Sequence, residues 1–305
     1  MNPSPALSLN RVTKRFDDFT AVDELSLDVQ PGKIFGLIGP NGAGKTTTIR
    51  MIVGITRPDS GSVELFGRQM STKLQEEIGY LPEERGLYKK MKVGDQLRFF
   101  GQMKGMSSVA AESAVDRWLE RLKLSEWKTH KTDELSKGMQ QKIQFIATVM
   151  HEPRLLILDE PFSGFDPVNA ELLKEIVLEM KTPERAIIFS THMMEQAEEM
   201  CDEICMINRS RKVLAGNLRE VKRGFGRNTV AVEIESGSGE TVFRNSALVT
   251  EVETKDNRHE VTLAPNVTSQ DLLHHLIHAG ANITRFERVE PRLHDIFITK
   301  VGEAS

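Results

Sequence analysis

Runs of consecutive apolar residues recur along the first two thirds of the chain and predict buried strands. The predicted strands are Lys33–Ile38, Leu155–Leu158 and Ala186–His192, and stretches with helical spacing separate them. Strands that are apolar on both faces are typical of a parallel sheet covered by helices. The pattern therefore predicts a core of the α/β class.

Alternating patterns predict further strands at Ala6–Val12, Ala21–Val29 and Gly61–Gly67. Another strand, Ile78–Leu81, breaks into a polar loop at Pro82. From about residue 93 to residue 124 the apolar residues recur at helical spacing instead. We expect a helical subdomain, about residues 93–145, inserted between strands of the core.

The pattern changes again near residue 228 and predicts a small α+β domain. Its expected elements are strands Val230–Ile234, His259–Leu263 and Ile283–Val289, with helices Gln270–His278 and Arg292–Ile298. We therefore expect two domains, residues 1–225 and 228–305. In the first of these helices, His274 and His278 could ligate a metal, but no third ligand is identifiable, so solvent-facing histidines are the other interpretation.

The composition mainly argues against certain classes of protein. The 305 residues are 39% hydrophobic and 28% charged, with a net charge of −4, which argues against a dedicated nucleic-acid binder. No run approaches the roughly 18 apolar residues that span a bilayer, and the first residues do not resemble a secretory signal. We expect a cytoplasmic protein in which Cys201 and Cys205 are buried, reduced thiols.

The turn after the first buried strand has the form G-x-x-x-x-G-K-[ST], with a helix following it. Its glycines let backbone N–H groups approach phosphate oxygens at a helix N-terminus. We expect Lys45 to reach the β- and γ-phosphates and the Thr46 hydroxyl to ligate Mg²⁺. The predicted nucleotide-binding residues of this turn are Gly39, Pro40, Asn41, Gly42, Ala43, Gly44, Lys45, Thr46 and Thr47.

Two other strand ends carry candidate chemistry. Asp159 could hold Mg²⁺ and Glu160 could polarise a water for attack on the γ-phosphate, although two acids at a strand end can also be solvated surface charge. His192 ends the next buried strand and is a candidate γ-phosphate sensor, since the carboxyl ends of parallel strands meet at one edge. A lone histidine is more often structural.

Two further features permit a structural and a functional interpretation. Ser136 is a plausible cap of a long helix, and with Gly138 it could form a second anion-binding helix N-terminus. Phe16 and Phe19 could each stack on an adenine, but ordinary core packing is the better interpretation of that segment alone.

Over residues 6–220 the chain resembles the ATP-binding subunit of an ATP-binding cassette (ABC) transporter, through the order of phosphate loop, glutamine-type loop, Leu-Ser-x-Gly motif, acidic strand, Asp turn and His strand. The resemblance implies an ATPase that dimerises head to tail around two ATP molecules. By this resemblance Phe16 stacks on the adenine, and Ser136 and Gly138 contact the γ-phosphate from the opposite subunit. Asp166 couples the two sites. Glu160 is the catalytic base and His192 is the switch histidine.

Two departures from the family pattern bear on the site. Lys137-Gly138-Met139 replaces the usual Gly-Gly-Gln and adds a positive charge near phosphate. Glu83 stands where a glutamine is usual, which puts the Mg²⁺ and water contacts of that loop in doubt. We nevertheless expect Glu83, with Thr46 and Asp159, to lie at the metal.

The resulting hypothesis is an ATPase subunit, homodimeric or paired with another ATPase subunit, that binds ATP and Mg²⁺. It would drive a separate integral-membrane permease from the inner face of the cell membrane. The residues Glu290–Phe297 resemble the tail of exporter ATPases, so we expect export. The alternative is a soluble ABC ATPase acting on ribosomes or DNA, although such proteins usually carry a second cassette or a long coiled-coil insertion.

Overall fold

A computed structural model describes residues 4–84, 86–226, 228–236, 239–255 and 258–303. Met1–Pro3, where a secretory signal would begin, lie outside these ranges. The chain divides into two compact units, residues 1–218 and 219–305, so the segment Arg219–Phe225 belongs to the second unit, whereas the expected boundary placed it in the first.

The first unit is built on a sheet with the strand order β10-β9-β3-β8-β7-β6. Its strands are β3 (Ile34–Ile38), β6 (Ile78–Leu81), β7 (Leu155–Asp159), β8 (Ala186–Thr191), β9 (Glu203–Asn208) and β10 (Arg211–Asn217). All pairs are parallel except β9 with β10. Every residue of β3, β7 and β8 is buried, so the prediction of a mainly parallel α/β core is confirmed.

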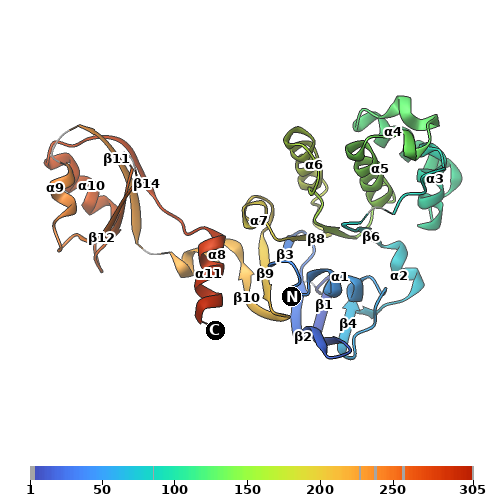
Figure 1. Ribbon diagram of the computed structural model, residues 1–305, viewed down its shortest axis with the longest axis horizontal. Helices are drawn as coiled ribbons and strands as arrows, with labels where there is room; N and C mark the ends of the chain where they lie inside the picture. The colour runs from blue at the N-terminus through green and yellow to red at the C-terminus, as the bar shows by residue number, and fades with distance from the viewer. Residues whose placement is uncertain (1–3, 85, 227, 237–238, 256–257, 304–305) are drawn as a thin grey trace. The chain divides into compact units, whose positions relative to one another are not determined.

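A second, antiparallel sheet has the order β2-β1-β4-β5 (Figure 1). It consists of β1 (Leu7–Phe16), β2 (Phe19–Val29), β4 (Ser60–Leu65) and the short β5 (Arg68–Gln69). Phe16 and Phe19 flank the turn between β1 and β2 and are 49% and 59% exposed. Their interpretation as core residues is therefore wrong, because the tip of this hairpin extends past the packed apolar face.

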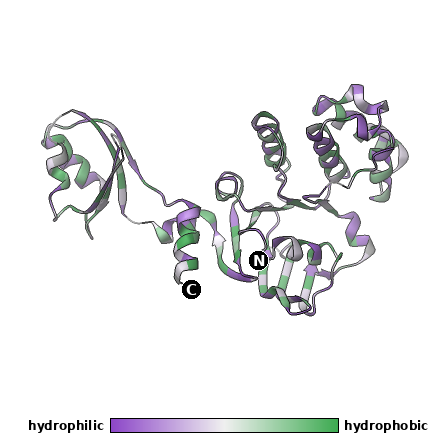
Figure 2. Cartoon of the chain, in the orientation of Figure 1, coloured by the Kyte–Doolittle hydropathy of each residue, from purple (hydrophilic) through white to green (hydrophobic). Residues whose placement is uncertain are grey.

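Helices α3 (Val93–Met103), α4 (Ser108–Arg121) and α5 (Lys137–Val149) lie side by side and form the helical subdomain (Figure 1). The remaining helices of this unit are α1 (Lys45–Ile52), α2 (Thr72–Glu76), α6 (Pro167–Glu179) and α7 (Met194–Met200), with α8 (Leu218–Phe225) at the boundary. Figure 2 shows hydrophobic and hydrophilic residues alternating around α5 and α6, as amphipathic helices require. Cys201 and Cys205 are buried free thiols, as predicted, and burial raises the pKa of both.

The second unit contains an antiparallel sheet with the order β12-β13-β11-β14. Its strands are β11 (Thr229–Ser236), β12 (Val249–Lys255), β13 (Arg258–Leu263) and β14 (Asn282–Arg288), and its helices are α9 (Gly239–Phe243), α10 (Ser269–His278) and α11 (Leu293–Glu303). A separate apolar core includes Val230, Val261, Leu272 and Leu276. The predicted α+β class is correct, although β12, α8 and α9 were not predicted.

Candidate functional site

Four predicted strands deliver polar loops to one edge of the parallel sheet. The phosphate loop follows β3, Glu83 follows β6, Glu160 follows β7 and His192 follows β8. Register alignment pairs Ile38 of β3 with Thr191 of β8, and Asp159 of β7 with Ser190 of β8, so the ends of these strands are level. The topology therefore brings together residues that lie more than 150 positions apart in the chain.

Backbone geometry explains two glycines of the phosphate loop. Gly39 has φ +155°, and a Cβ there would lie 2.0 Å from the carbonyl oxygen of Ile207. Gly44 has φ +108°, and a Cβ there would lie 2.4 Å from the carbonyl oxygen of Ala21. Gly44 also precedes α1 without a side-chain cap, and the first residues of this helix line the cavity, so their N–H groups are available to a bound anion.

Lys45 is folded against the phosphate loop. Its Nζ donates hydrogen bonds to the carbonyl oxygens of Gly39 at 2.8 Å and Pro40 at 3.3 Å. The same Nζ lies 3.8 Å from Oε1 of Glu160. Burial lowers the pKa of Lys45, while the nearby carboxylates of Glu160, Asp159 and Glu83 act in the opposite direction. A buried ammonium surrounded by acceptors is suited to a phosphate group.

Asp159 is 1% exposed, and its Oδ2 accepts a hydrogen bond from the Thr46 hydroxyl at 3.1 Å. Its Oδ1 is buried and has no hydrogen-bond partner among the described residues. Burial raises the pKa of Asp159, and the charges of Glu160 and Glu83 act in the same direction. An orphaned, buried carboxylate oxygen beside a hydroxyl provides the hard oxygen ligands that Mg²⁺ prefers.

Glu160 is held in a fixed orientation by its neighbours. Its Oε1 accepts hydrogen bonds from the backbone N–H of His192 at 2.9 Å and contacts Nδ1 of His192 at 2.8 Å. The Thr191 hydroxyl donates to Oε2 at 3.3 Å. The backbone of Glu160 has φ +49°, an uncommon left-handed conformation that turns the chain directly after β7. The role of Thr191 was not predicted, although its position before His192 at a strand end was a usable signal.

A cavity of about 300 Å³ lies between these groups. Its lining residues are Phe19, Ala21, Asn41, Gly42, Gly44, Lys45, Thr46, Thr47, Glu83 and Glu160. Glu83 is thus brought beside the phosphate loop, whereas Phe16 is exposed at the hairpin tip and does not line the cavity. Phe19, which the sequence interpretation passed over in favour of Phe16, forms part of the wall.

Ser136, Gly138 and Asp166 do not line this cavity. The Ser136 hydroxyl caps α5 by accepting from the Met139 N–H at 3.3 Å, and a Cβ at Gly138 would meet nothing within 4 Å. The Asp166 carboxylate caps α6 by accepting from the N–H groups of Val168 and Asn169, each at 3.1 Å. The predicted cap at Ser136 is confirmed, and the end of α5 is open to an external group.

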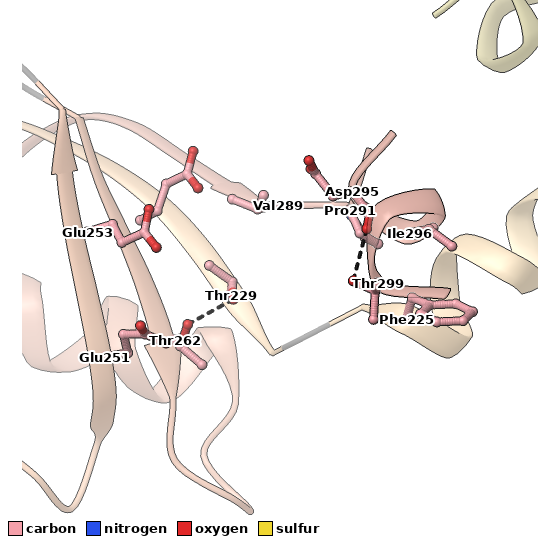
Figure 3. Close-up of a pocket in the computed structure, with 11 residues that line it drawn as sticks. Phe225, Thr229, Glu251, Glu253, Thr262, Val289, Pro291, Asp295, Ile296 and Thr299 are labelled. Atoms are coloured by element: carbon pink, nitrogen blue, oxygen red, sulfur yellow. Dashed lines mark hydrogen bonds between the residues drawn. The ribbon is translucent and has the colours of Figure 1, made fainter. Parts of the chain in front are cut away.

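The second unit has its own pocket of about 500 Å³, between the sheet and α11 (Figure 3). Glu251, Glu253, Thr229 and Thr262 come from the sheet, and Thr229 and Thr262 share a hydrogen bond at 3.1 Å. The described residues contain no group of three histidine, cysteine or carboxylate side chains able to hold a metal. The possible metal site at His274 and His278 therefore gains no third ligand in this part of the structure.

Two family models match the chain. The first, described as "ABC transporter", covers residues 22–163, and the second, described as "ATP-binding protein DrrA1-3-like, C-terminal domain", covers residues 216–301.

Relatives also match along the chain. An uncharacterized ABC transporter ATP-binding protein of Bacillus subtilis, YhaQ, is 46% identical over 296 residues, which are 97% of this chain and 98% of the relative. The Nod factor export ATP-binding protein I of Burkholderia pseudomallei is 38% identical over 213 residues, 69% of this chain and 70% of the relative. A solved structure, titled "Structure of ATP binding subunit of ABC transporter", is 29% identical with a TM-score of 0.68, and the match covers 72% of this chain and 93% of that one.

Proposed function

Because the chain belongs to the ABC transporter family of ATP-binding proteins and is an ABC transporter ATPase, we propose that it hydrolyses Mg-ATP to power export through a separate membrane permease. The observation that carries this proposal is the position of Glu160. Its carboxylate lies 3.8 Å from the Nζ of the phosphate-loop lysine and is oriented by two hydrogen-bonding groups of His192. The candidate base and the phosphate-binding cation thus line one cavity, and the candidate sensor His192 contacts the base.

In the proposed reaction a water oxygen attacks the γ-phosphorus of ATP, and the bond from that phosphorus to the β–γ bridging oxygen breaks. Glu160 orients this water and accepts its proton, because Oε2 has only one weak donor, Thr191, at 3.3 Å. Lys45 exchanges the loop carbonyls for phosphate oxygens, and the N-terminus of α1 binds them through N–H groups. His192 holds Glu160 in place through its backbone N–H and its Nδ1, and we propose that it senses the γ-phosphate.

Magnesium fits the residues present. Thr46 and Asp159 would hold it, with Glu83 as a further oxygen ligand from the facing loop. When bound, the ion neutralises charge on the β- and γ-phosphates. Few protein ligands are needed, since Mg²⁺ usually retains several waters and substrate phosphates in its shell. For the adenine we propose stacking on Phe16, as the family resemblance implies, and we add Phe19 because it lines the cavity.

We further propose a head-to-tail dimer in which a second ATPase subunit completes each site. Ser136 and Gly138 lie at the open end of α5 and outside the cavity of their own chain, which is where groups that serve the opposite subunit would lie. Asp166, at the start of α6, would couple the two sites.

An exposed aromatic patch supports docking to a permease at the inner face of the cell membrane. Tyr88 and Phe99 are 54% and 40% exposed, and the Tyr88 ring lies 6.3 Å from the ring of Phe99 and 5.9 Å from that of Phe100, centroid to centroid. Within the described residues, no helix has the length and apolarity to cross a membrane. The Nod factor export relatives favour export over import.

The substitution Glu160→Gln tests the proposal. A glutamine keeps an oxygen that can accept from the His192 N–H but cannot take a proton from water. We expect kcat to fall about 10²- to 10⁴-fold, the loss typical of a single general base, while ATP affinity is unchanged. Size-exclusion chromatography with Mg-ATP should show a persistent dimer.

The matched control is Glu120→Gln on the exposed face of α4, which should leave kcat unchanged. A Glu160→Gln protein that hydrolyses ATP at the wild-type rate would exclude Glu160 as the base. One that binds ATP normally but remains a monomer would exclude the head-to-tail arrangement.

A further inference from the structure

The position of Glu83 depends on the backbone that carries it. Its side chain is exposed and makes no hydrogen bond or ion pair with the described residues, yet it lines the phosphate cavity. Pro82 and Glu84, its neighbours, lie where the chain leaves β6 for the helical subdomain. Whatever fixes these two residues also fixes Glu83.

Gln144 of α5 makes that connection. Its side-chain amide lies within 3.4 Å of the carbonyl oxygen of Pro82 and 3.0 Å from that of Glu84, and it donates to both. The residue is 7% exposed, so this amide has little access to water as an alternative partner. The two acceptors stand on either side of Glu83, and a single amide therefore spans the residue.

The helix that carries Gln144 is itself tightly seated on the sheet. A Cβ at Gly79 of β6 would lie 2.4 Å from the carbonyl oxygen of Thr148, so only glycine permits this approach of α5 to β6. One turn before Gln144, the Gln141 amide donates to the carbonyl oxygen of Ser163 at 2.6 Å, in the turn that follows Glu160. Residues three apart share one face of a helix. The same face of α5 therefore contacts the loops on both sides of the cavity, and Glu83, Gln141, Gln144 and Glu160 line one small gap.

We propose that Gln144 is a positioning residue whose buried amide holds the Pro82–Glu84 loop so that Glu83 faces the phosphate cavity. Its effect on turnover rests on the role proposed above for Glu83 at the metal. The two hydrogen bonds from Gln144 to this loop, here called the clamp, restrain the loop whether or not ATP is bound. Their effect on the loop can therefore be measured without ATP.

The first measurement is cleavage by a glutamate-specific protease after Glu83 or Glu84 in the full chain. Gln144→Leu removes the donor, and the loss of a buried amide bond should speed cleavage at this loop about tenfold, without faster cleavage after exposed glutamates elsewhere. Gln102→Leu, an exposed glutamine of α3, is the matched control and should change nothing. Gln144→Glu is the second variant, because an ionised carboxylate of the same length cannot donate. Unchanged cleavage in both variants would overturn the proposal.

The second measurement is the Mg²⁺ concentration for half-maximal ATPase rate in Gln144→Leu, Glu83→Ala and the double variant. If Gln144 acts through Glu83, its substitution should shift this concentration about threefold or more in the wild-type background and not at all with Glu83→Ala. A full, additive shift in the double variant would contradict positioning. A faster cleavage with no Mg²⁺ effect of Glu83→Ala would retain the clamp and exclude Glu83 from the metal site.

Discussion

Replacing Asp159 by asparagine should stabilise the nucleotide-free protein while it abolishes Mg²⁺-dependent turnover. The carboxylate is 1% exposed and one of its oxygens has no hydrogen-bond partner. A buried charge that is only partly compensated destabilises the folded state, and a neutral amide of the same shape removes that penalty.

The expected size follows from the contacts. Asparagine can still accept from the Thr46 hydroxyl, and its N–H₂ group could donate to the buried Ser190 hydroxyl, which interacts with the Asp159 carboxylate and lowers its pKa. An unsatisfied buried group costs about 1–3 kcal/mol, and Lys45 already compensates part of the charge, so we expect a gain of about 2 kcal/mol. For a unit of this size, about 2–4 °C accompany each kcal/mol, which gives a rise of about 5 °C in the thermal midpoint.

Scanning calorimetry with a chelator and without nucleotide measures this directly. Asp166→Asn is the control. Asparagine and aspartate are equally good helix caps, so the thermal midpoint of this variant should move by less than about 1 °C. A lower midpoint for Asp159→Asn would show that the charge is well compensated and that the burial argument is wrong. Equal stabilisation of variant and wild type by Mg-ATP would exclude Asp159 as a metal ligand.

Three further outcomes are expected. Burial lowers the pKa of His151 to about 4, so between about pH 6.5 and 4 the unfolded chain binds a proton that the folded chain does not. The thermal midpoint should therefore fall as the pH is lowered through that range, and it should fall less in His151→Gln. Parallel pH profiles of the two proteins would contradict this. Glu83→Gln should keep the ATPase rate within about tenfold and lower the Mg²⁺ needed for half-maximal rate, because it removes one negative charge from the cavity; an unchanged requirement in Mg²⁺ titrations would count against a metal role. Every lining residue of the phosphate cavity precedes Leu218, so a chain that ends there should keep an ATP affinity within about tenfold of that of the full chain, or about 1.4 kcal/mol. Equilibrium titration measures this affinity. A larger loss would mean that the second unit takes part in the site.

The sequence was most informative where strands are buried on both faces. β3, β7 and β8 are buried along their whole lengths and consist of apolar residues up to their last one or two positions in β7 and β8, so the polar groups at their ends could be assigned to one edge. The strand β12 was missed because, after Val249, its residues up to Thr254 are exposed and it lies at the edge of its sheet, where charged residues are common.

Contacts between distant segments could not be predicted in the same way. Nothing in the sequence near Gln144 distinguishes it from other glutamines of the helix, and its acceptors lie about 60 residues earlier. The exposure of Phe16 and Phe19 depends on how far the β1–β2 hairpin extends past the sheet, which alternation of residues does not specify. The fold class followed from local patterns, whereas the fine positioning of the site depends on tertiary packing.

The strand order of the main sheet also determines when the protein can begin to work during its synthesis. β3, which leads into the phosphate loop, has β8 and β9 as its two neighbours, and about 150 residues separate the end of β3 from the start of β8. At about 5–20 residues per second, a ribosome needs roughly 7 to 30 seconds to make that segment. Throughout this interval five apolar residues of β3 have neither of their strand partners. The nascent chain should therefore depend on chaperones until residue 208 has emerged, and nucleotide binding should appear late and abruptly.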